Sequence, residues 1–213
     1  MPNIFTCLCL ILSLQTVLFA HQPRIVTKDS VEIYNPVISQ AFYATMNGKP
    51  QIYTIKSDKP FDLYVQLTLP DINGIKKDFV VDIYHNNHRL AELKGTDADW
   101  TSFYEPFGGD NYLEGPDFEK KNADTGTYTI KVTSPDNTGK YILVTGKEES
   151  FPPSEIVKTI ILLPKIKRFM GESALTAYFN YTGLFILLSL LIIAAIIYVV
   201  VIIVRKIRRS RSR

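Results

Sequence analysis

The sequence has little cysteine: of its 213 residues only Cys7 and Cys9 are of this type. Both lie in an apolar run, residues 4–19, that ends at the small residue Ala20. Such a run is typical of a secretory signal peptide, and we expect cleavage after Ala20. An uncleaved N-terminal anchor is the alternative. After cleavage the chain has no cysteine, which excludes disulfides and cysteine nucleophiles, so an exported domain of about 130 residues must rely on its hydrophobic core.

The chain also lacks the short motifs of common enzymes. It contains no G-x-S-x-G, H-E-x-x-H, phosphate-loop or dinucleotide-binding pattern. Its three histidines are His21, His85 and His88. The last two flank Asn86-Asn87, which predicts a two-residue hairpin turn with the histidines as cross-strand neighbours. Two imidazoles fall short of the three or four ligands of a tight metal site. We therefore expect no enzyme.

Charged residues are absent from one long run, residues 184–204, with the sequence LFILLSLLIIAAIIYVVVIIV. A run of this length crosses a hydrocarbon core of about 30 Å. Six cations follow within the last nine residues, which predicts that the C-terminus faces the cytoplasm. We expect a type I single-pass protein of the plasma membrane, with its larger part outside the cell.

The basic tail also accounts for the charge balance. The whole chain carries a net charge of +3, and without the six tail cations the remainder carries −3. A cationic tail beside a span is expected to contact anionic membrane lipid. Nucleic acid is not a predicted partner.

The exported part alternates apolar and polar residues. In FDLYVQLTL, residues 61–69, every second position is apolar, as in a half-buried antiparallel strand, and Tyr64, Gln66 and Thr68 are expected to face water. GTYTIKVTS, residues 126–134, repeats the pattern. Turn-forming segments separate six further β-rich runs: VEIY, QIYTIKS, FVVDIY, HRLAEL, DWTSFY and KYILVTG. Seven to nine short strands predict an all-β fold, an antiparallel β-sandwich. Residues 39–45 form either a strand or a helical turn.

Residues 103–120, FYEPFGGDNYLEGPDFEK, gather aromatic residues, glycines and acids on a predicted loop. Loops on a rigid sandwich often carry function. We therefore select as candidate ligand-binding residues Trp100, Tyr104, Glu105, Asp110, Tyr112, Glu114 and Asp117. Asp110, Glu114 and Asp117 are also the candidate calcium ligands, because calcium prefers several oxygen ligands. No other cofactor is expected. A structural turn without a ligand remains an alternative.

The segment between the sandwich and the span changes character. FPPSEIVKTIILLPKIKRFMGES, residues 151–173, places apolar residues at helical spacing after two prolines, although a last strand of the sandwich is a competing prediction. Pro164 is expected to end or kink the helix. Cations and apolar residues alternate after it, which suits a segment on the membrane surface.

Three fragments resemble the bacterial pre-peptidase C-terminal type of domain. QIYTIKSDKPFDLYVQL resembles its opening strand pair, DFVVDIYHNNHRLAEL a strand–turn–strand unit, and GTYTIKVTSPDNTGKYILVTG its closing hairpin with two Gly-x-Tyr strands. The resemblance covers about residues 50–146. It implies a jelly-roll-like sandwich that binds and does not catalyse. The acidic stretch from Asp97 to Glu119 has no counterpart in it.

The expected domain organisation has five parts: a signal peptide (1–20), an extracytoplasmic sandwich (21–150), a juxtamembrane linker with an amphipathic segment (151–182), a transmembrane helix (183–204) and a basic tail (205–213). The predicted function is a non-catalytic binding module that engages a protein or carbohydrate ligand outside the cell. The alternative is a structural accessory subunit of a membrane protein complex.

Overall fold

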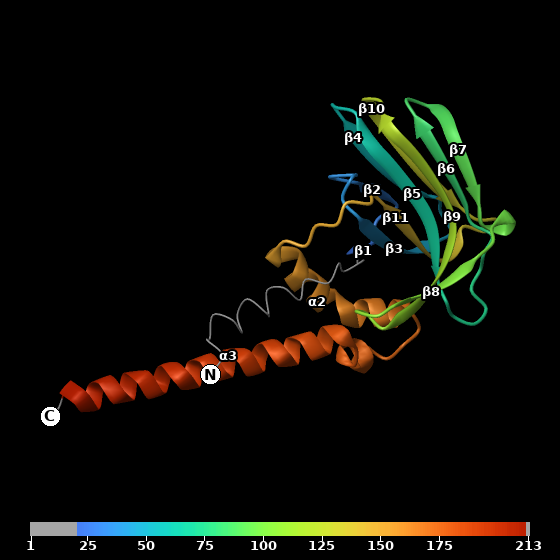
Figure 1. Ribbon diagram of the computed structural model, residues 1–213. Helices are drawn as coiled ribbons and strands as arrows, with labels where there is room; N and C mark the ends of the chain where they lie inside the picture. Colours follow the sequence, from blue (N-terminus) through green and yellow to red (C-terminus); the bar gives the residue numbers. More distant parts are fainter. Residues whose placement is uncertain (1–20, 212–213) are drawn as a thin grey trace.

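The computed structural model describes residues 21–211, so the predicted signal peptide lies outside the described residues. Two β-sheets pack face to face, helix α2 lies beside them, and the long helix α3 extends away from the sandwich (Figure 1). The predicted all-β sandwich with one apolar C-terminal helix is confirmed.

The first sheet has six strands and the second has five. In spatial order the six-stranded sheet contains β1 (Gln22–Ile25), β3 (Gln40–Asn47), β11 (Thr138–Thr145), β5 (Phe61–Pro70), β9 (Asp110–Ala123) and β8 (Thr101–Glu105). The five-stranded sheet contains β2 (Ser30–Glu32), β4 (Gln51–Ser57), β10 (Gly126–Thr133), β6 (Val80–His85) and β7 (His88–Lys94). The pairing is antiparallel except that β1 runs parallel to β3 and β2 parallel to β4, a departure from the all-antiparallel prediction.

The residues that line the sandwich interior are those that the alternation in the sequence predicted to be buried. Leu63, Val65 and Leu67 of β5 are fully buried, as are Ile130 and Val132 of β10 on the opposing sheet. Burying one such side chain contributes roughly 1.5–3 kcal/mol relative to leaving it in water. The predicted hairpin turn is also confirmed, because Asn86 and Asn87 have φ angles of 45° and 70° and His85 pairs with His88.

The structure decides between the two alternatives predicted for one segment and differs from the prediction for another. Residues 39–45 belong mainly to strand β3, which buries residues on both of its sides. The expected loop at 103–120 is mostly a hairpin of β8 and β9, with a short tip between Glu105 and Asp110. The acids and aromatic residues were correctly seen as a group, but backbone pairing extends most of them along strands.

Helix α2 (Pro153–Phe169) is one continuous helix. Of the two alternatives predicted at Pro164, an end of the helix or a kink, the first is therefore wrong. Proline lacks the N–H that would bond the carbonyl of Ile160, four residues earlier. The hydroxyl of Tyr178 donates to that carbonyl instead, at 3.1 Å. Tyr178 closes the short helix η2 (Ala174–Tyr178), which links α2 to α3. A further short helix, η1 (Gly95–Asp97), precedes β8.

Helix α3 (Tyr181–Arg211) contains the predicted span. Within the described residues it is the one helix long and apolar enough to cross a membrane, and its apolar stretch is not buried against the rest of the protein. Strand β11 ends at Thr145 and α3 begins at Tyr181, so α2 and η2 occupy the connection between sandwich and candidate span.

Candidate functional site

The six-stranded sheet is covered on its outer face as well as its inner one. Ala41, Tyr43, Ile142 and Val144 point away from the sandwich interior and form a second apolar cluster. Tyr112 of β9 and the α2 residues Ile166 and Met170 complete this cluster. Helix α2 therefore packs on the sheet through this face, and its position at the membrane surface stays a prediction.

A buried ion pair holds α2 against the hairpin. Lys167 Nζ lies 2.8 Å from Asp110 Oδ1, and the two side chains are 3% and 1% exposed. Lys167 also donates to the Gly109 carbonyl at 3.1 Å and pairs with Glu172 at 2.9 Å. At the other end of α2, Glu155 pairs with Arg24 of β1 at 2.8 Å. The helix is thus fixed at both ends by charged contacts.

The tip of the β8–β9 hairpin is bound by the segment next to the span. Three successive carbonyls, those of Phe107, Gly108 and Gly109, accept hydrogen bonds from Thr182 Oγ1, Asn180 Nδ2 and Lys167 Nζ. Within the tip, the Glu105 carboxylate accepts from the Phe107 and Gly108 amides at 2.8 and 2.6 Å. The tip therefore joins the sandwich to the start of α3.

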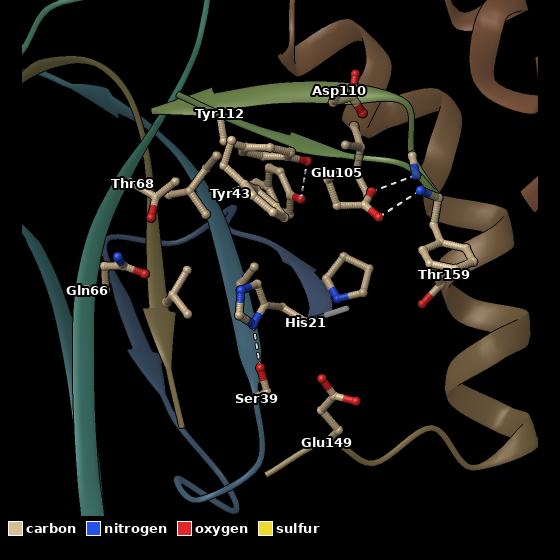
Figure 2. Close-up of a pocket in the computed structure, with 18 of the residues that line it drawn as sticks. His21, Ser39, Tyr43, Gln66, Thr68, Glu105, Asp110, Tyr112, Glu149 and Thr159 are labelled. Carbon is tan, nitrogen blue, oxygen red and sulfur yellow. Dashed lines mark hydrogen bonds between the residues drawn. The ribbon is translucent and has the colours of Figure 1, made fainter. Parts of the chain in front are cut away.

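Beneath α2 the outer face leaves a cavity of about 500 Å³. It lies between β3, β11, β5 and β9 on one side and α2 with the hairpin tip on the other (Figure 2). Its apolar lining includes Tyr43, Tyr112, Ile142, Val144, Leu163 and Ile166. Its polar lining includes His21, Ser39, Gln66, Thr68, Glu105, Asp110, Glu114, Lys147, Glu149 and Thr159. A cavity with both kinds of wall is suited to a ligand that has both an apolar and a polar part.

Several polar atoms in this lining have no partner. Thr68 Oγ1, Asp110 Oδ2 and Thr159 Oγ1 are buried and make no hydrogen bond among the described residues. Buried polar atoms in native proteins are nearly always bonded, so each of these is a point where a ligand or a water would be stabilised. A second cavity of about 850 Å³ lies beside β1 and β2, and none of the unpartnered buried side-chain atoms found in residues 21–211 lines it. The cavity beneath α2 is therefore the stronger candidate.

The cavity also alters the titration of its acids and of its histidine. Burial raises the pKa of Glu105 above its usual range, although two backbone amides oppose the shift. Burial raises the pKa of Asp110 as well, against the attraction of Lys167. The ring of His21 points into the cavity (Figure 2), and the loss of water around it lowers its pKa to about 4, although the residue as a whole is exposed. The imidazole is therefore neutral at physiological pH.

Two hydrogen-bonded pairs of tyrosines occur, one at the cavity wall and one inside the sandwich. The hydroxyls of Tyr43 and Tyr112 are 3.0 Å apart, and burial raises the pKa of both. The hydroxyls of Tyr53 and Tyr141 are 2.9 Å apart in the interior between the sheets. Only the first pair borders the cavity.

The structure brings together four of the seven predicted ligand-binding residues. Those that line the cavity are Glu105, Asp110, Tyr112 and Glu114. Trp100 lies elsewhere: its indole N–H donates to the Gly95 carbonyl at 2.9 Å, and its ring covers Gly115, where an added Cβ would lie 2.5 Å from the ring. Tyr104 is 56% exposed on β8, and Asp117 is exposed on β9.

The three predicted calcium ligands follow one another along β9. A strand rises about 3.3 Å per residue, so Asp110 and Asp117 are roughly 20 Å apart along it, too far to share one ion. Asp110 instead pairs with Lys167. No group of three or more metal-ligating side chains occurs within residues 21–211. The geometry gives the calcium hypothesis no support.

Sequence reasoning missed the residues that line the cavity from β3 and β5. Tyr43 belongs to the segment left open between strand and helical turn. We predicted that Tyr64, Gln66 and Thr68 face water, because they alternate with the core residues of β5. The available signal was the segment AFYA of β3, residues 41–44, because four adjacent apolar residues indicate a strand that is covered on both faces.

No protein-family model matches the chain, and no curated protein matches it. Among solved structures, PliG of Aeromonas hydrophila, a periplasmic inhibitor of g-type lysozyme, matches 58% of this chain and 97% of its own at 11% identity and a TM-score of 0.36. The pre-peptidase C-terminal domain of a Bacillus anthracis collagenase matches 59% of this chain and 95% of its own at 14% identity and a TM-score of 0.32.

A third similar structure is CorA, a surface-associated copper-binding protein of Methylomicrobium album BG8. It matches 59% of this chain and 100% of its own at 8% identity and a TM-score of 0.31. The fold-level resemblance to the pre-peptidase C-terminal domain, predicted from three sequence fragments, is thus confirmed. At these identities and scores the likenesses concern the fold alone.

Proposed function

We propose that the protein is a membrane-anchored, non-catalytic binding module that takes a small ligand, or one group of a larger ligand, into the cavity beneath α2. The observation that carries this proposal is the cavity itself, about 500 Å³ in volume, with an apolar wall and unpartnered buried oxygens. The anchor is α3, and its basic end is assigned to the cytoplasm because cations next to a span resist translocation. The cavity then opens on the extracytoplasmic side, close to the membrane.

A neutral aromatic probe tests the proposal. In the full chain, solubilised in dodecyl maltoside and labelled at isoleucine methyl groups, benzyl alcohol should shift the methyl resonance of Ile142, which lines the cavity. It should not shift that of Ile130, which is fully buried between the sheets. Filling the cavity with Ala41→Leu should abolish the shift, because Ala41 lines the same wall. An unshifted Ile142, or equal shifts at both positions, would refute the proposed site.

One observation favours a second candidate function, ester or amide hydrolysis. Ser39 Oγ and His21 Nδ1 are hydrogen-bonded and both line the cavity, as a nucleophile and its base would. Within the described residues, however, no carboxylate hydrogen-bonds the other ring nitrogen of His21, and such a third group usually orients the base. Turnover of an activated aryl ester that disappears in Ser39→Ala would establish this reading in place of the binding module.

The accessory-subunit alternative depends on a different part of the protein. It requires α3 to recognise another membrane protein, whereas the binding module requires only the sandwich, α2 and the hairpin tip. Ala41→Leu separates the two, because it lies in the cavity wall and leaves α3 unchanged. If the partners captured from membranes are the same with and without this substitution, they do not require the cavity, which is the result the accessory-subunit alternative predicts.

A further inference from the structure

The charges that line the cavity are mostly negative. Four carboxylates line it, those of Glu105, Asp110, Glu114 and Glu149, against one lysine, Lys147. Asp110 is neutralised by Lys167, and Glu105 accepts from two amides. The side-chain carboxylates of half-buried Glu114 and exposed Glu149 form no ion pair with a cation in the described range 21–211. Two carboxylates of the lining are thus left without a counter-charge.

The chain already places a cation against this wall. Lys147 Nζ lies 4.3 Å from the centre of the Tyr64 ring and pairs with Glu119. An ammonium between an aromatic face and a carboxylate is an energetically favourable arrangement. Burial raises the pKa of Tyr64, and the nearby carboxylates of Asp117, Glu114 and Glu119 raise it further, in keeping with this placement of acids at the wall.

The unpartnered oxygens point to the same ligand chemistry. Thr68 is 5% exposed, its Oγ1 has no partner, and it is the direct cross-strand neighbour of Glu114. Asp110 Oδ2 is also buried and unpartnered, and an ionised carboxylate can only accept. A ligand that donates hydrogen bonds or carries positive charge suits these acceptors, whereas an anion would be repelled by Glu114 and Glu149.

The remaining wall accommodates an apolar group. Tyr43, Ile142, Val144 and the α2 residues Leu163 and Ile166 border the same cavity. An uncharged, strongly hydrated ligand such as a simple sugar would place its own polar atoms against this apolar wall, where they find no hydrogen-bond partners. A ligand that joins an ammonium group to an aromatic or aliphatic group would match both walls.

We propose that the cavity beneath α2 binds an organic ammonium compound, with its cationic group beside Glu114, Thr68 and Tyr64 and its apolar group against Tyr43 and Ile142. This assignment rests on the proposed function and specifies its ligand class. The ammonium group belongs either to a free amine or to a membrane lipid headgroup, since Thr182 at the start of α3 also lines the cavity. The chemistry recognised is the same for both sources.

A matched set of probes tests the ligand class. Benzyl alcohol, benzyltrimethylammonium and phenylacetate share one ring and differ in charge, and their binding to the full chain in dodecyl maltoside is measured from the Ile142 methyl shift. The cation should bind about tenfold more tightly than the neutral alcohol because Glu114 and Glu149 attract it, and this ratio corresponds to about 1.4 kcal/mol. Phenylacetate should bind more weakly than either.

Variants connect the preference to named residues. Glu114→Gln combined with Glu149→Gln should bring the affinity for the cation down to that for the alcohol. Glu148→Gln is the control, because it removes the exposed carboxylate next to Glu149 without lining the cavity. Equal affinity for cation and alcohol in the wild-type chain would overturn the ligand class while leaving the proposed site intact. Absence of binding by all three probes would instead refute the site.

A second arm identifies the source of the ammonium group. The same titration is repeated with the chain in phosphatidylcholine nanodiscs, whose lipids carry a trimethylammonium headgroup. If lipid is the occupant, the nanodisc should reduce the apparent affinity for benzyltrimethylammonium at least tenfold relative to dodecyl maltoside. Unchanged affinity assigns the site to a free amine. Both results support an ammonium ligand, and a preference for phenylacetate in either medium contradicts it.

Discussion

A hydrogen-bonded tyrosine pair lies on each side of the six-stranded sheet, in different surroundings, and the inner pair joins this sheet to the five-stranded one. Inside the sandwich, Tyr53 and Tyr141 share a hydrogen bond at 2.9 Å, and both side chains are fully buried. On the outer face, Tyr43 and Tyr112 share one at 3.0 Å beside a cavity. The inner face is closed by a second sheet of strands, whereas the outer face is closed by one helix. The comparison shows that a single helix fills the space over this face only in part, and the space that remains beneath the helix is the candidate site.

The largest expected effect concerns the ion pair that closes the outer face. Lys167→Met leaves Asp110 buried without its counter-charge, and breaking such a pair typically costs about 3–5 kcal/mol. We expect that loss in the free energy of opening α2, measured by hydrogen exchange of the α2 amides in the full chain. Lys165→Met, an exposed position two residues earlier, should change it by less than about 0.5 kcal/mol.

A double variant checks the cause of that loss. Lys167→Met with Asp110→Leu removes both charges and should restore a large part of the protection. If the double variant opens as readily as Lys167→Met alone, the contribution of Lys167 is packing or its bond to the Gly109 carbonyl, and the role given to the ion pair is wrong.

The next largest effect is expected from substitutions at two adjacent core residues, whose losses of unfolding free energy should differ between the two faces of the sheet. Leu143 of β11 points into the sandwich and is fully buried, whereas Ile142 borders the cavity. Leu143→Ala should lower the free energy of unfolding by about 2–5 kcal/mol. Ile142→Ala should cost clearly less, because a side chain beside a cavity has fewer packing partners to lose. Equal losses in denaturant unfolding would show that the outer face is as tightly packed as the inner one.

The tyrosine pairs themselves give a smaller contrast. Tyr141→Phe leaves the Tyr53 hydroxyl buried without a partner, and the free energy of unfolding should fall by about 1–3 kcal/mol. Tyr112→Phe should cost less than about 1 kcal/mol, since the Tyr43 hydroxyl lies at the cavity and water can replace its partner. A larger loss for Tyr112→Phe would indicate that the outer pair is the better sealed of the two.

The smallest expected effect is a pH dependence at the hairpin tip. Burial raises the pKa of Glu105 above 4.5, so the folded chain holds this proton more tightly than the unfolded chain. The folded state therefore gains stability as the pH falls from neutral towards about 4.5, and the gain is complete below the unfolded pKa.

Glu105→Gln provides the reference for this effect, because it cannot titrate at that position. The free energy of unfolding of the wild type, relative to the variant, should rise as the pH falls from neutral to about 4.5. A relative stability that falls over this range would mean that the two amide donors, and not burial, dominate the titration of Glu105.

The difference between the inner and outer faces also explains which features of the protein could be predicted from its sequence. The alternation in residues 61–69 identified Leu63, Val65 and Leu67 correctly because the inner face depends on local period-two patterning. The turn at Asn86-Asn87 and the apolar run in α3 are local signals too. These features depend on residues close together in the chain.

The outer face depends on contacts between distant segments. Asp110 and Lys167 are 57 residues apart, and the tip carbonyl of Phe107 binds Thr182, 75 residues away. Nothing near residue 64, 66 or 68 indicates that α2 will cover those positions. The grouping of Glu105, Asp110, Tyr112 and Glu114 was still visible, because those residues lie on one hairpin. The sequence could thus predict one wall of the cavity, but not the helix that encloses it.

The central claim is that the outer face admits a cationic ligand and the inner face does not, and thiol labelling tests it most directly. Single cysteines are introduced on β5 as Thr68→Cys, in the cavity lining, and Val65→Cys, fully buried between the sheets, with Cys7 and Cys9 replaced by serine. Each full chain is treated with methanethiosulfonate reagents bearing trimethylammonium or sulfonate groups, and each rate is divided by that reagent's rate with free cysteine. We expect labelling at position 68, faster with the cation, and none at position 65. No labelling at position 68, or faster labelling by the anion, would contradict it.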